Sequence, residues 1–124
     1  MRREVLSVHD LGPEHFGEFD MAFCSDVLLH LRDPLRAMEN IWRVTKQFAI
    51  FADVYNPELE AFKNKALTEF CMVGETDVWW RPSSTTLYLM LHVARFSRVE
   101  EVSRFKLNSH FEGEIPKVVY KAYH

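Results

Sequence analysis

The stretch FDMAFCSDVLLHLRDPLRAMENIWRVTK, residues 19–46, decides the fold. Its opening segment FDMAFCS is almost continuously apolar, as in a strand that is covered on both faces. Asp33 and Pro34 then mark a helix start, because Asp is a favoured N-cap and Pro loses no hydrogen bond at the first helical position. Apolar residues follow at helical spacing, with charged residues on the other side. The stretch therefore predicts a strand, a polar turn and an amphipathic helix.

The segments on either side extend this pattern. EVLSVHDL (4–11) and QFAIFADVYN (47–56) predict two more strands. Asn56-Pro57 predicts a second helix that runs to roughly Met72, before a connection around Gly74, and Ser83 or Ser84 caps a third helix. VEEVSRFKL (99–107) and KVVYKAY (117–123) predict an antiparallel pair. The expected fold class is therefore α/β, with parallel strands, an antiparallel C-terminal pair and helices on the faces.

Composition narrows the kind of protein. The 124 residues predict a single domain over 1–124. The net charge of −3, with acidic and basic residues interleaved, argues against a nucleic-acid-binding surface. Cys24 and Cys71 lie far apart and form no CxxC pair, which favours a cytoplasmic setting. No apolar run is long enough for a membrane span, no signal-peptide pattern opens the chain, and no HExxH or Cys/His cluster predicts a metal site.

Several motifs together resemble the class I S-adenosylmethionine-dependent methyltransferases. The matching segments are VHDL, GEFDMAFCSDVLLHLRDPLRAMENIWRVTK, IFADVYNPELE and WWRPSSTTLYLMLHVARF. The W-x-P-S segment looks most similar to the branch that includes the tRNA wobble-uridine methyltransferases. The resemblance implies a Rossmann-like sheet and S-adenosylmethionine as cofactor. It covers almost the whole chain, which corresponds only to the later part of a full enzyme.

The earlier part of such an enzyme has no counterpart in these residues. The family's fold opens with a strand and a glycine-rich turn against the cofactor, a close approach that only glycine permits. Glycine occurs here at positions 12, 17, 74 and 113 alone, so no G-x-G can be written. The resemblance thus predicts a truncated domain with an incomplete sheet, in which the strand at 19–25 has a free edge. Because free edges pair with other chains, we expect a homodimer or higher oligomer formed through the N-terminal strands, or a missing partner chain.

By this resemblance, four residues of the chain correspond to cofactor-binding positions of the family. Asp10 matches the acidic residue that faces the adenine amino group, and Leu11 matches its apolar neighbour against the ring. Cys24 and Ser25 match a strand end whose backbone carbonyls approach the ammonium and methionine portion. Two alternatives stay open from the residues themselves: Asp10 before Leu-Gly-Pro also suits a turn start, and Cys24 also suits a small buried apolar position.

Methyl transfer requires a positioned nucleophile and, for hydroxyl or amine substrates, a group that removes a proton. His30 is the candidate base, because it follows the predicted strand end closely; the alternative is a structural residue that closes the turn before Asp33. Asp26 and Asp53 end two predicted strands, where they suit either substrate orientation or capping.

Trp79-Trp80-Arg81 is the candidate substrate-binding segment. The indole rings suit a planar substrate and the guanidinium suits a phosphate or carboxylate, but two adjacent tryptophans equally suit packing or an interface. Two functions remain: a methyltransferase-like enzyme completed from elsewhere, and a non-enzymatic oligomeric module derived from one. The absent glycine turn weighs against cofactor binding and catalysis by this chain alone.

Overall fold

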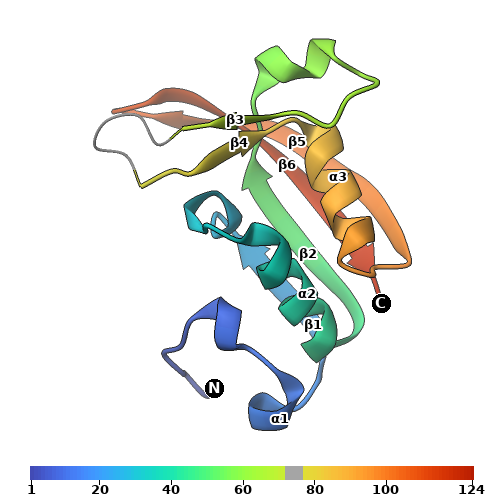
Figure 1. Ribbon diagram of the computed structural model, residues 1–124. Helices are drawn as coiled ribbons and strands as arrows, with labels where there is room; N and C mark the ends of the chain where they lie inside the picture. Colours follow the sequence, from blue (N-terminus) through green and yellow to red (C-terminus); the bar gives the residue numbers. More distant parts are fainter. Residues whose placement is uncertain (72–76) are drawn as a thin grey trace.

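A computed structural model describes residues 1–71 and 77–124, and its centre is a four-stranded mixed sheet (Figure 1). The strands follow the order β1-β2-β6-β5. Strands β1 and β2 are parallel, whereas β6 is antiparallel to both β2 and β5. Their bounds are Phe19–Ser25 for β1, Thr45–Val54 for β2, Arg98–Ser109 for β5 and Gly113–Tyr123 for β6. The predicted fold class, α/β with an antiparallel C-terminal pair, is confirmed.

Helix α2, Pro34–Val44, connects the parallel strands β1 and β2 as the sequence predicts. The Asp33 carboxylate caps it by accepting a hydrogen bond from the Arg36 backbone N–H at 3.0 Å. Met38 and Ile41 are buried in the core, so the apolar side of the helix packs inward. The quoted stretch thus folds locally as its periodicity indicates, and the parallel pairing of β1 with β2 follows from the helical crossover.

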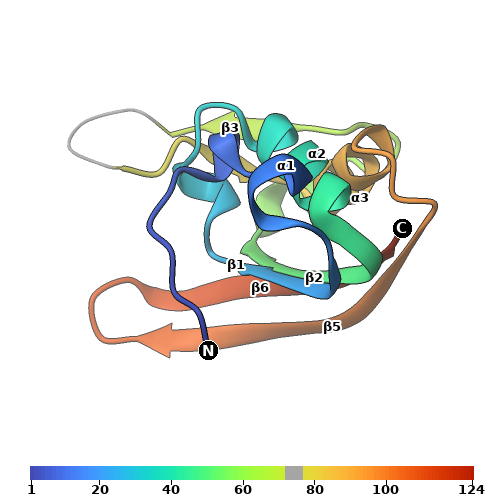
Figure 2. The same cartoon turned by 90° about the horizontal axis from the view of Figure 1, so that it is seen from below.

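Helix α3, Ser84–Val93, begins at the N-cap Ser83, whose side chain accepts a hydrogen bond from the Thr86 backbone N–H. Its residues Leu87 and Leu91 join the same hydrophobic core as α2. Both helices therefore lie on one side of the sheet, as Figure 2 shows. No helix of the described residues is long and apolar enough to cross a membrane.

The two faces of the sheet differ in how they are covered. We call the side under α2 and α3 the covered face; among its residues are Ala22, Cys24, Ala49, Phe51, Asp53, Val118, Tyr120 and Ala122. The alternate positions form the open face, with Met21, Phe23, Phe48, Ile50, Val119, Lys121 and Tyr123. Covered-face residues are mostly buried, whereas Met21 and Phe23 are exposed. No helix in the described part of the chain lies over the open face.

The strand expected at residues 4–11 is wrong. Residues Val8–Asp10 form the short 3₁₀ helix η1, followed by the one-turn helix α1 at Pro13–Phe16. A strand at 4–11 would need a neighbouring strand for its backbone hydrogen bonds. Within the described ranges these residues pair with no strand, and β1 pairs only with β2. The carbonyls of Val8 and His9 instead accept hydrogen bonds from the buried Asn40 side chain of α2, at 3.0 and 2.9 Å. That side chain satisfies backbone groups that a sheet would otherwise satisfy.

The helix expected from Asn56-Pro57 to about Met72 is also wrong. The cap forms as predicted, but only the 3₁₀ helix η3, Pro57–Ala61, follows it. The chain then turns into strand β3, Thr68–Phe70, which pairs with β4, Trp80–Pro82. Phe62 and Phe70 remain exposed, and Phe70 contacts the Trp80 ring of the β3–β4 hairpin, so the apolar residues that predicted a helix do not pack into the core. Met72 and Gly74 lie outside the described residues.

The predicted antiparallel pair at the C-terminus is confirmed. Residues 113–116 of β6 extend past the end of β2 and pair only with β5, so the tip of the β5–β6 hairpin projects beyond the sheet (Figure 1). Gly113 has φ +73°, which suits glycine at the turn. The projecting tip stands opposite the β3–β4 hairpin and forms one wall of the crevice described next.

Candidate functional site at the carboxyl end of the sheet

The end of β1 carries a charged pair that reaches across the sheet. Asp26 continues the ladder by donating its backbone N–H to Ala52 at 3.0 Å, and its φ of +56° is the left-handed conformation. Its carboxylate accepts hydrogen bonds from Ser25 Oγ at 3.0 Å and from Lys117 Nζ at 2.5 Å. The Lys117 side chain, from β6, is only 5% exposed. A left-handed non-glycine residue held by a buried lysine is the kind of fixed geometry that clusters at functional sites.

Asp53 lies at the neighbouring strand end, on the covered face. It is 4% exposed, and its carboxylate accepts hydrogen bonds from the backbone N–H groups of Val54 and Leu28 at 2.8 and 3.2 Å. Burial raises the pKa of Asp53 to about 6, reinforced by the charge of Asp26 and opposed by the two hydrogen bonds and by Lys117. Within the carboxyl end of the sheet, Asp53 is therefore a carboxylate with little compensation for its charge.

Cys24, one of the four carried-over positions, is a buried residue of the core. Burial raises the pKa of its thiol to about 12, and the nearby charges of Asp53 and Asp26 act in the same direction. Burial therefore favours the neutral thiol, which is less nucleophilic than the thiolate. The adjoining Ser25 is half-buried and bonded to Asp26. Any contact of these two residues with a cofactor stays a prediction.

Asp10 and Leu11 occupy a turn rather than the end of a strand. Asp10 is exposed, and Leu11 packs partly against the core. The hydrogen bonds that fix this turn lead to α2: Asn40 holds its carbonyls, and His9 Nε2 lies 3.1 Å from the Asp33 carbonyl oxygen. The structure thus attaches the turn to α2 and does not test the adenine-binding role of either residue.

His30 ends the short 3₁₀ helix η2, Leu28–His30, and its ring is partly exposed. Its Nδ1 lies 3.1 Å from the Asp77 carbonyl oxygen and 3.7 Å from Asp77 Oδ2. Both contacts tie η2 to the segment that leads into β4, in keeping with the structural alternative. Its role as a base stays a prediction.

The two tryptophans of the candidate substrate segment have separate surroundings. The Arg32 guanidinium lies 4.9 Å from the Trp79 ring centroid, which occupies one face of that ring. Trp80 donates its indole N–H to the Leu31 carbonyl at 3.0 Å, and its ring centroid lies 5.2 Å from that of Phe70. Both rings therefore take part in packing between η2 and the β3–β4 hairpin, and a role of either ring in substrate binding stays a prediction.

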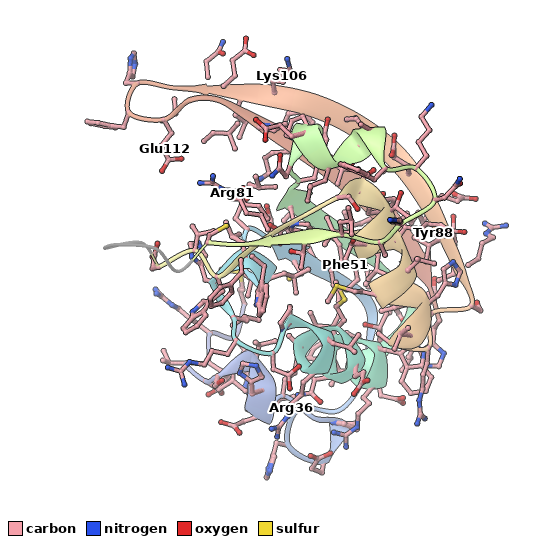
Figure 3. The ribbon with its side chains drawn as sticks, turned by 45° about the horizontal axis from the view of Figure 1, so that its top comes forward. Arg36, Phe51, Arg81, Tyr88, Lys106 and Glu112 are labelled. Atoms are coloured by element: carbon pink, nitrogen blue, oxygen red, sulfur yellow. The ribbon has the colours of Figure 1, made fainter. Side chains whose placement is uncertain are left out.

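Arg81 lines a polar crevice of about 350 Å³ between the β3–β4 and β5–β6 hairpins. Figure 3 shows Arg81 and Glu112 on the two sides of this space. Arg81 Nη1 is 3.8 Å from Glu69 Oε1, and the other acidic residues of the lining are Glu58 and Glu114. Acidic side chains thus outnumber the single arginine among the described lining residues, so the crevice favours cationic or neutral polar groups over a phosphate.

A second, apolar cavity of about 220 Å³ lies on the covered face, between the start of α2, α3 and the β3–β4 hairpin. Its walls include Leu35, Leu87, Met90, Trp80 and Asp53. In residues 1–71 and 77–124 no three His, Cys, Asp or Glu side chains converge as metal ligands do. The carboxyl end of the sheet therefore offers one polar and one apolar space.

Lys117 is the functional candidate that sequence reasoning missed. Its partner Asp26 is 91 positions away, so no local spacing connects them. The one available signal is a lysine at the start of the apolar run KVVYKAY, where a buried strand position needs a partner for its charge. Asp53 was identified as a strand end, but its apolar cavity depends on β3–β4, which the sequence did not predict.

Comparisons with known proteins agree with this architecture. Residues 3–52 match the model of a methyltransferase domain family. The N-terminal domain of EvdMO1, crystallised in the presence of SAH and D-fucose, is similar over 97% of this chain and 53% of its own, with 16% identity and a TM-score of 0.68. Magnesium protoporphyrin IX methyltransferase (ChlM) from Synechocystis PCC 6803, with bound SAH, is similar over 96% of this chain and 49% of its own, with 15% identity and a TM-score of 0.60. No curated protein matches the sequence.

Residues 3–52 thus resemble a methyltransferase domain, and the fold of the described chain is similar to that of SAM-dependent methyltransferases. The arsenic(III) S-adenosylmethionine methyltransferase CrArsM from Chlamydomonas reinhardtii is similar over 95% of this chain and 42% of its own, at 14% identity and a TM-score of 0.64. The chain spans about half the length of the first structures that it matches. The tRNA wobble-uridine branch stays a prediction.

Proposed function

We propose that this chain is the later half of a SAM-dependent methyltransferase domain. A complementary segment that carries the glycine-rich turn completes its cofactor site. That segment belongs either to the same polypeptide or to another one. The observation that carries the proposal is β1: among the described strands it pairs with β2 alone, and its open-face residues Met21 and Phe23 are exposed. An apolar strand of this kind is ordinarily bonded and covered on both sides.

The residues present supply only part of a cofactor site. The ends of β1 and β2 offer backbone carbonyls and the fixed Asp26–Lys117 pair, which suit the polar amino-acid end of a cofactor. The chain contains no G-x-G, and Asp10 is an exposed turn residue. The fit is therefore incomplete, and we derive no catalytic step for the chain alone. The cofactor supplies the methyl group, and the complete protein would position the nucleophile.

The substrate region of this proposal is the crevice between the two hairpins, which Arg81 lines. The W-x-P-S motif, Trp80 to Ser83, supports the tRNA wobble-uridine branch, whereas the acidic crevice and the net charge of −3 oppose contact with a polyanion there. A small polar substrate therefore fits the crevice better than a nucleic-acid backbone.

The second candidate is a non-enzymatic homo-oligomer that uses the same β1 edge and open face. The exposure of Phe23, at 67%, favours it, because a second copy would remove this apolar surface from water. In this form the chain would act through assembly, and β1 of one protomer would pair with β1 of its partner. A monomer at all concentrations in light scattering would exclude the homo-oligomer.

The decisive experiment is a calorimetric titration of the 124-residue chain with S-adenosylhomocysteine, with light scattering on the same samples. We expect no binding at millimolar ligand, followed by binding after addition of a segment that carries the glycine-rich turn. Micromolar binding by a monomer would overturn the proposal, because the site would then be complete without a second segment. Micromolar binding by a dimer would instead mean that the second copy rebuilds the site.

A matched pair of variants locates the surface. Phe23→Glu places a charge on the open face at β1, whereas Val102→Glu places one at another exposed apolar position, on the far edge strand β5. We expect Phe23→Glu to abolish association with the complementary segment or the second copy, and Val102→Glu to leave it intact. Loss of association in both variants, or in neither, would contradict the assignment to β1.

A further inference from the structure

The apolar cavity on the covered face is large enough for a small molecule. Its volume is about 220 Å³, whereas an apolar cavity of roughly 150 Å³ already admits benzene. Side chains from η2, α2, β4 and α3 form most of its wall, among them Leu28, Leu35, Trp80, Leu87 and Met90. A helix or strand of another chain would be too large for this space. The volume therefore suits one ring or a short hydrocarbon chain.

The polar side chains of the wall already have hydrogen bonds within the chain. Both Asp53 oxygens accept from backbone N–H groups, at 2.8 and 3.2 Å. The Trp80 indole N–H and the Thr86 hydroxyl each donate to a backbone carbonyl, at 3.0 and 2.6 Å. The Thr68 hydroxyl, the remaining polar group of the described lining, donates to the Glu69 carbonyl at 3.4 Å. The surface that faces the cavity is almost wholly apolar, so the wall offers a ligand neither an unpaired donor nor an exposed charge.

An apolar molecule is a better occupant of this cavity than water. A buried water needs several polar partners, and the wall provides almost none. An apolar ligand instead removes its own surface and that of the wall from water, which is favourable in proportion to the area buried. Leu35, Trp80 and Met90 are half-buried, so the rim of the cavity reaches the surface of the molecule and a ligand can enter it.

We propose that this cavity is a binding site for a small neutral apolar molecule, either an unsubstituted ring or a short hydrocarbon chain. Leu35 and Leu87 supply aliphatic contacts from the two helices, and the flexible Met90 side chain adapts to the shape of the ligand. The Trp80 ring adds an aromatic surface for a ligand ring. Polar and charged ligands are disfavoured, because they would lose their hydrogen bonds to water and gain none in the cavity. The inference goes beyond the methyltransferase assignment, because it needs neither a cofactor nor a second segment.

The test is a titration of the full 124-residue chain with toluene, phenol and benzylamine, followed by NMR of the side-chain methyl groups at neutral pH. Toluene should bind about tenfold more tightly than phenol, in which a hydroxyl of similar size replaces the methyl group and finds no partner. Benzylamine should also bind more weakly than toluene, because its ammonium group would leave water without compensation. The methyl groups of Leu35, Leu87 and Met90 should shift with toluene, whereas those of the exposed Leu89 on the same helix should not.

A matched pair of variants on α3 assigns the binding to the cavity. Met90→Trp places a large ring in the cavity and should weaken toluene binding at least about tenfold. Leu89→Trp adds the same ring at an exposed position of the helix and should leave the affinity unchanged. If Met90→Trp does not fold, Leu35→Phe at a half-buried position of α2 narrows the same space and replaces it in the test.

Four results would overturn the proposal. They are no toluene binding at millimolar concentration, phenol or benzylamine binding as tightly as toluene, full toluene affinity in the cavity-filling variant, and methyl shifts that follow the protein concentration instead of the ligand. The last result would mean that an apolar side chain of a second copy occupies the cavity. S-adenosylhomocysteine takes no part in these titrations, so this proposal and the proposed function fail independently.

Discussion

The two faces of one sheet have opposite surroundings although their sequences are similarly apolar. On the covered face Phe51 is 2% exposed, and its ring meets Phe96 edge-on at 5.6 Å. On the open face Phe23 of the adjoining strand is 67% exposed. Figure 3 shows Phe51 enclosed within the molecule. The amino-acid pattern therefore specifies two buried faces, while the described residues cover only one.

This difference shows which contacts already stabilise the described structure. Burial on the covered face removes apolar area from water at about 25 cal/mol per Å². The open face gains less: Met21 and Phe23 are exposed, and Phe48 is only partly buried, with Lys121 Nζ 4.2 Å from its ring centroid. Substitutions should therefore be costly on the covered side and nearly neutral at the exposed open-face positions of β1, unless a second segment or copy covers them.

The largest expected effect comes from Leu91→Ala on the covered side. Leu91 is fully buried in α3, so the substitution should lower the free energy of unfolding by about 3 kcal/mol through lost burial and a residual cavity. Urea unfolding followed by circular dichroism measures this loss. The matched control is Leu89→Ala on the same helix, because Leu89 is exposed and its loss should cost less than about 0.5 kcal/mol. Equal losses would mean that α3 packs through a different side.

Asp53 sharpens the comparison, because it is a charge on the covered side. Its pKa is raised from 3.8 to about 6, so its contribution to stability is complete below about pH 4 and is lost as the pH rises through 6. Asp53→Asn removes this dependence. Between pH 4 and 7.5 the free energy of unfolding of the variant should therefore rise by up to about 3 kcal/mol relative to that of the wild type. Thermal or urea unfolding across that range measures the difference. Parallel pH curves for the two proteins would show that Asp53 is not buried as a charge.

Glu60 gives a smaller effect at the edge of the covered region. Its carboxylate accepts from Ser84 N and Ser84 Oγ at 2.7 and 2.8 Å at the start of α3, and Arg104 lies 3.2 Å away. Burial opposes ionisation, but these hydrogen bonds outweigh it and lower the pKa of Glu60. Glu60→Gln should cost about 1 kcal/mol at neutral pH, and the cost should disappear as the pH falls through that lowered pKa.

The control for Glu60 is a surface ion pair without a helix terminus. Glu114 lies 3.2 Å from Lys106 with both side chains exposed, so Glu114→Gln should change stability by less than about 0.5 kcal/mol. Urea unfolding at pH 7 compares the two variants directly. A cost for Glu114→Gln as large as that for Glu60→Gln would remove the special role of the α3 start.

The comparison also explains what the sequence could predict. The β1–α2–β2 unit follows from residues 19–54 alone, because its apolar periodicity and the Asp33 cap act within the segment. The expected strand at 4–11 failed, because a strand depends on a neighbour and Asn40 of α2 binds its carbonyls instead. The expected helix after Asn56 is also absent, because Phe62 and Phe70 do not pack into the core and Phe70 instead belongs to the β3–β4 hairpin.

In the candidate site, too, the sequence predicts the local features and misses those that depend on distant residues. The ends of β1 and β2 were predicted from Cys24-Ser25-Asp26 and Asp53, since the position of a strand end is a local property. The buried partner Lys117 and the two cavities were not predicted, because they depend on side chains that the β5–β6 and β3–β4 hairpins bring from distant positions. Pairing over such distances has no signature in the spacing of a single sequence.

The smallest expected effect tests the open face itself. Phe23→Thr keeps a residue that favours strands but removes the exposed ring, so in a dilute monomer the free energy of unfolding should change by less than about 0.5 kcal/mol. Urea unfolding at two protein concentrations provides the measurement. If a second copy covers this face, the wild type becomes more stable as concentration rises and the variant does not, because association stabilises by mass action. A loss above 2 kcal/mol at every concentration would mean that the ring is already buried within one chain, and the distinction between the two faces would be wrong.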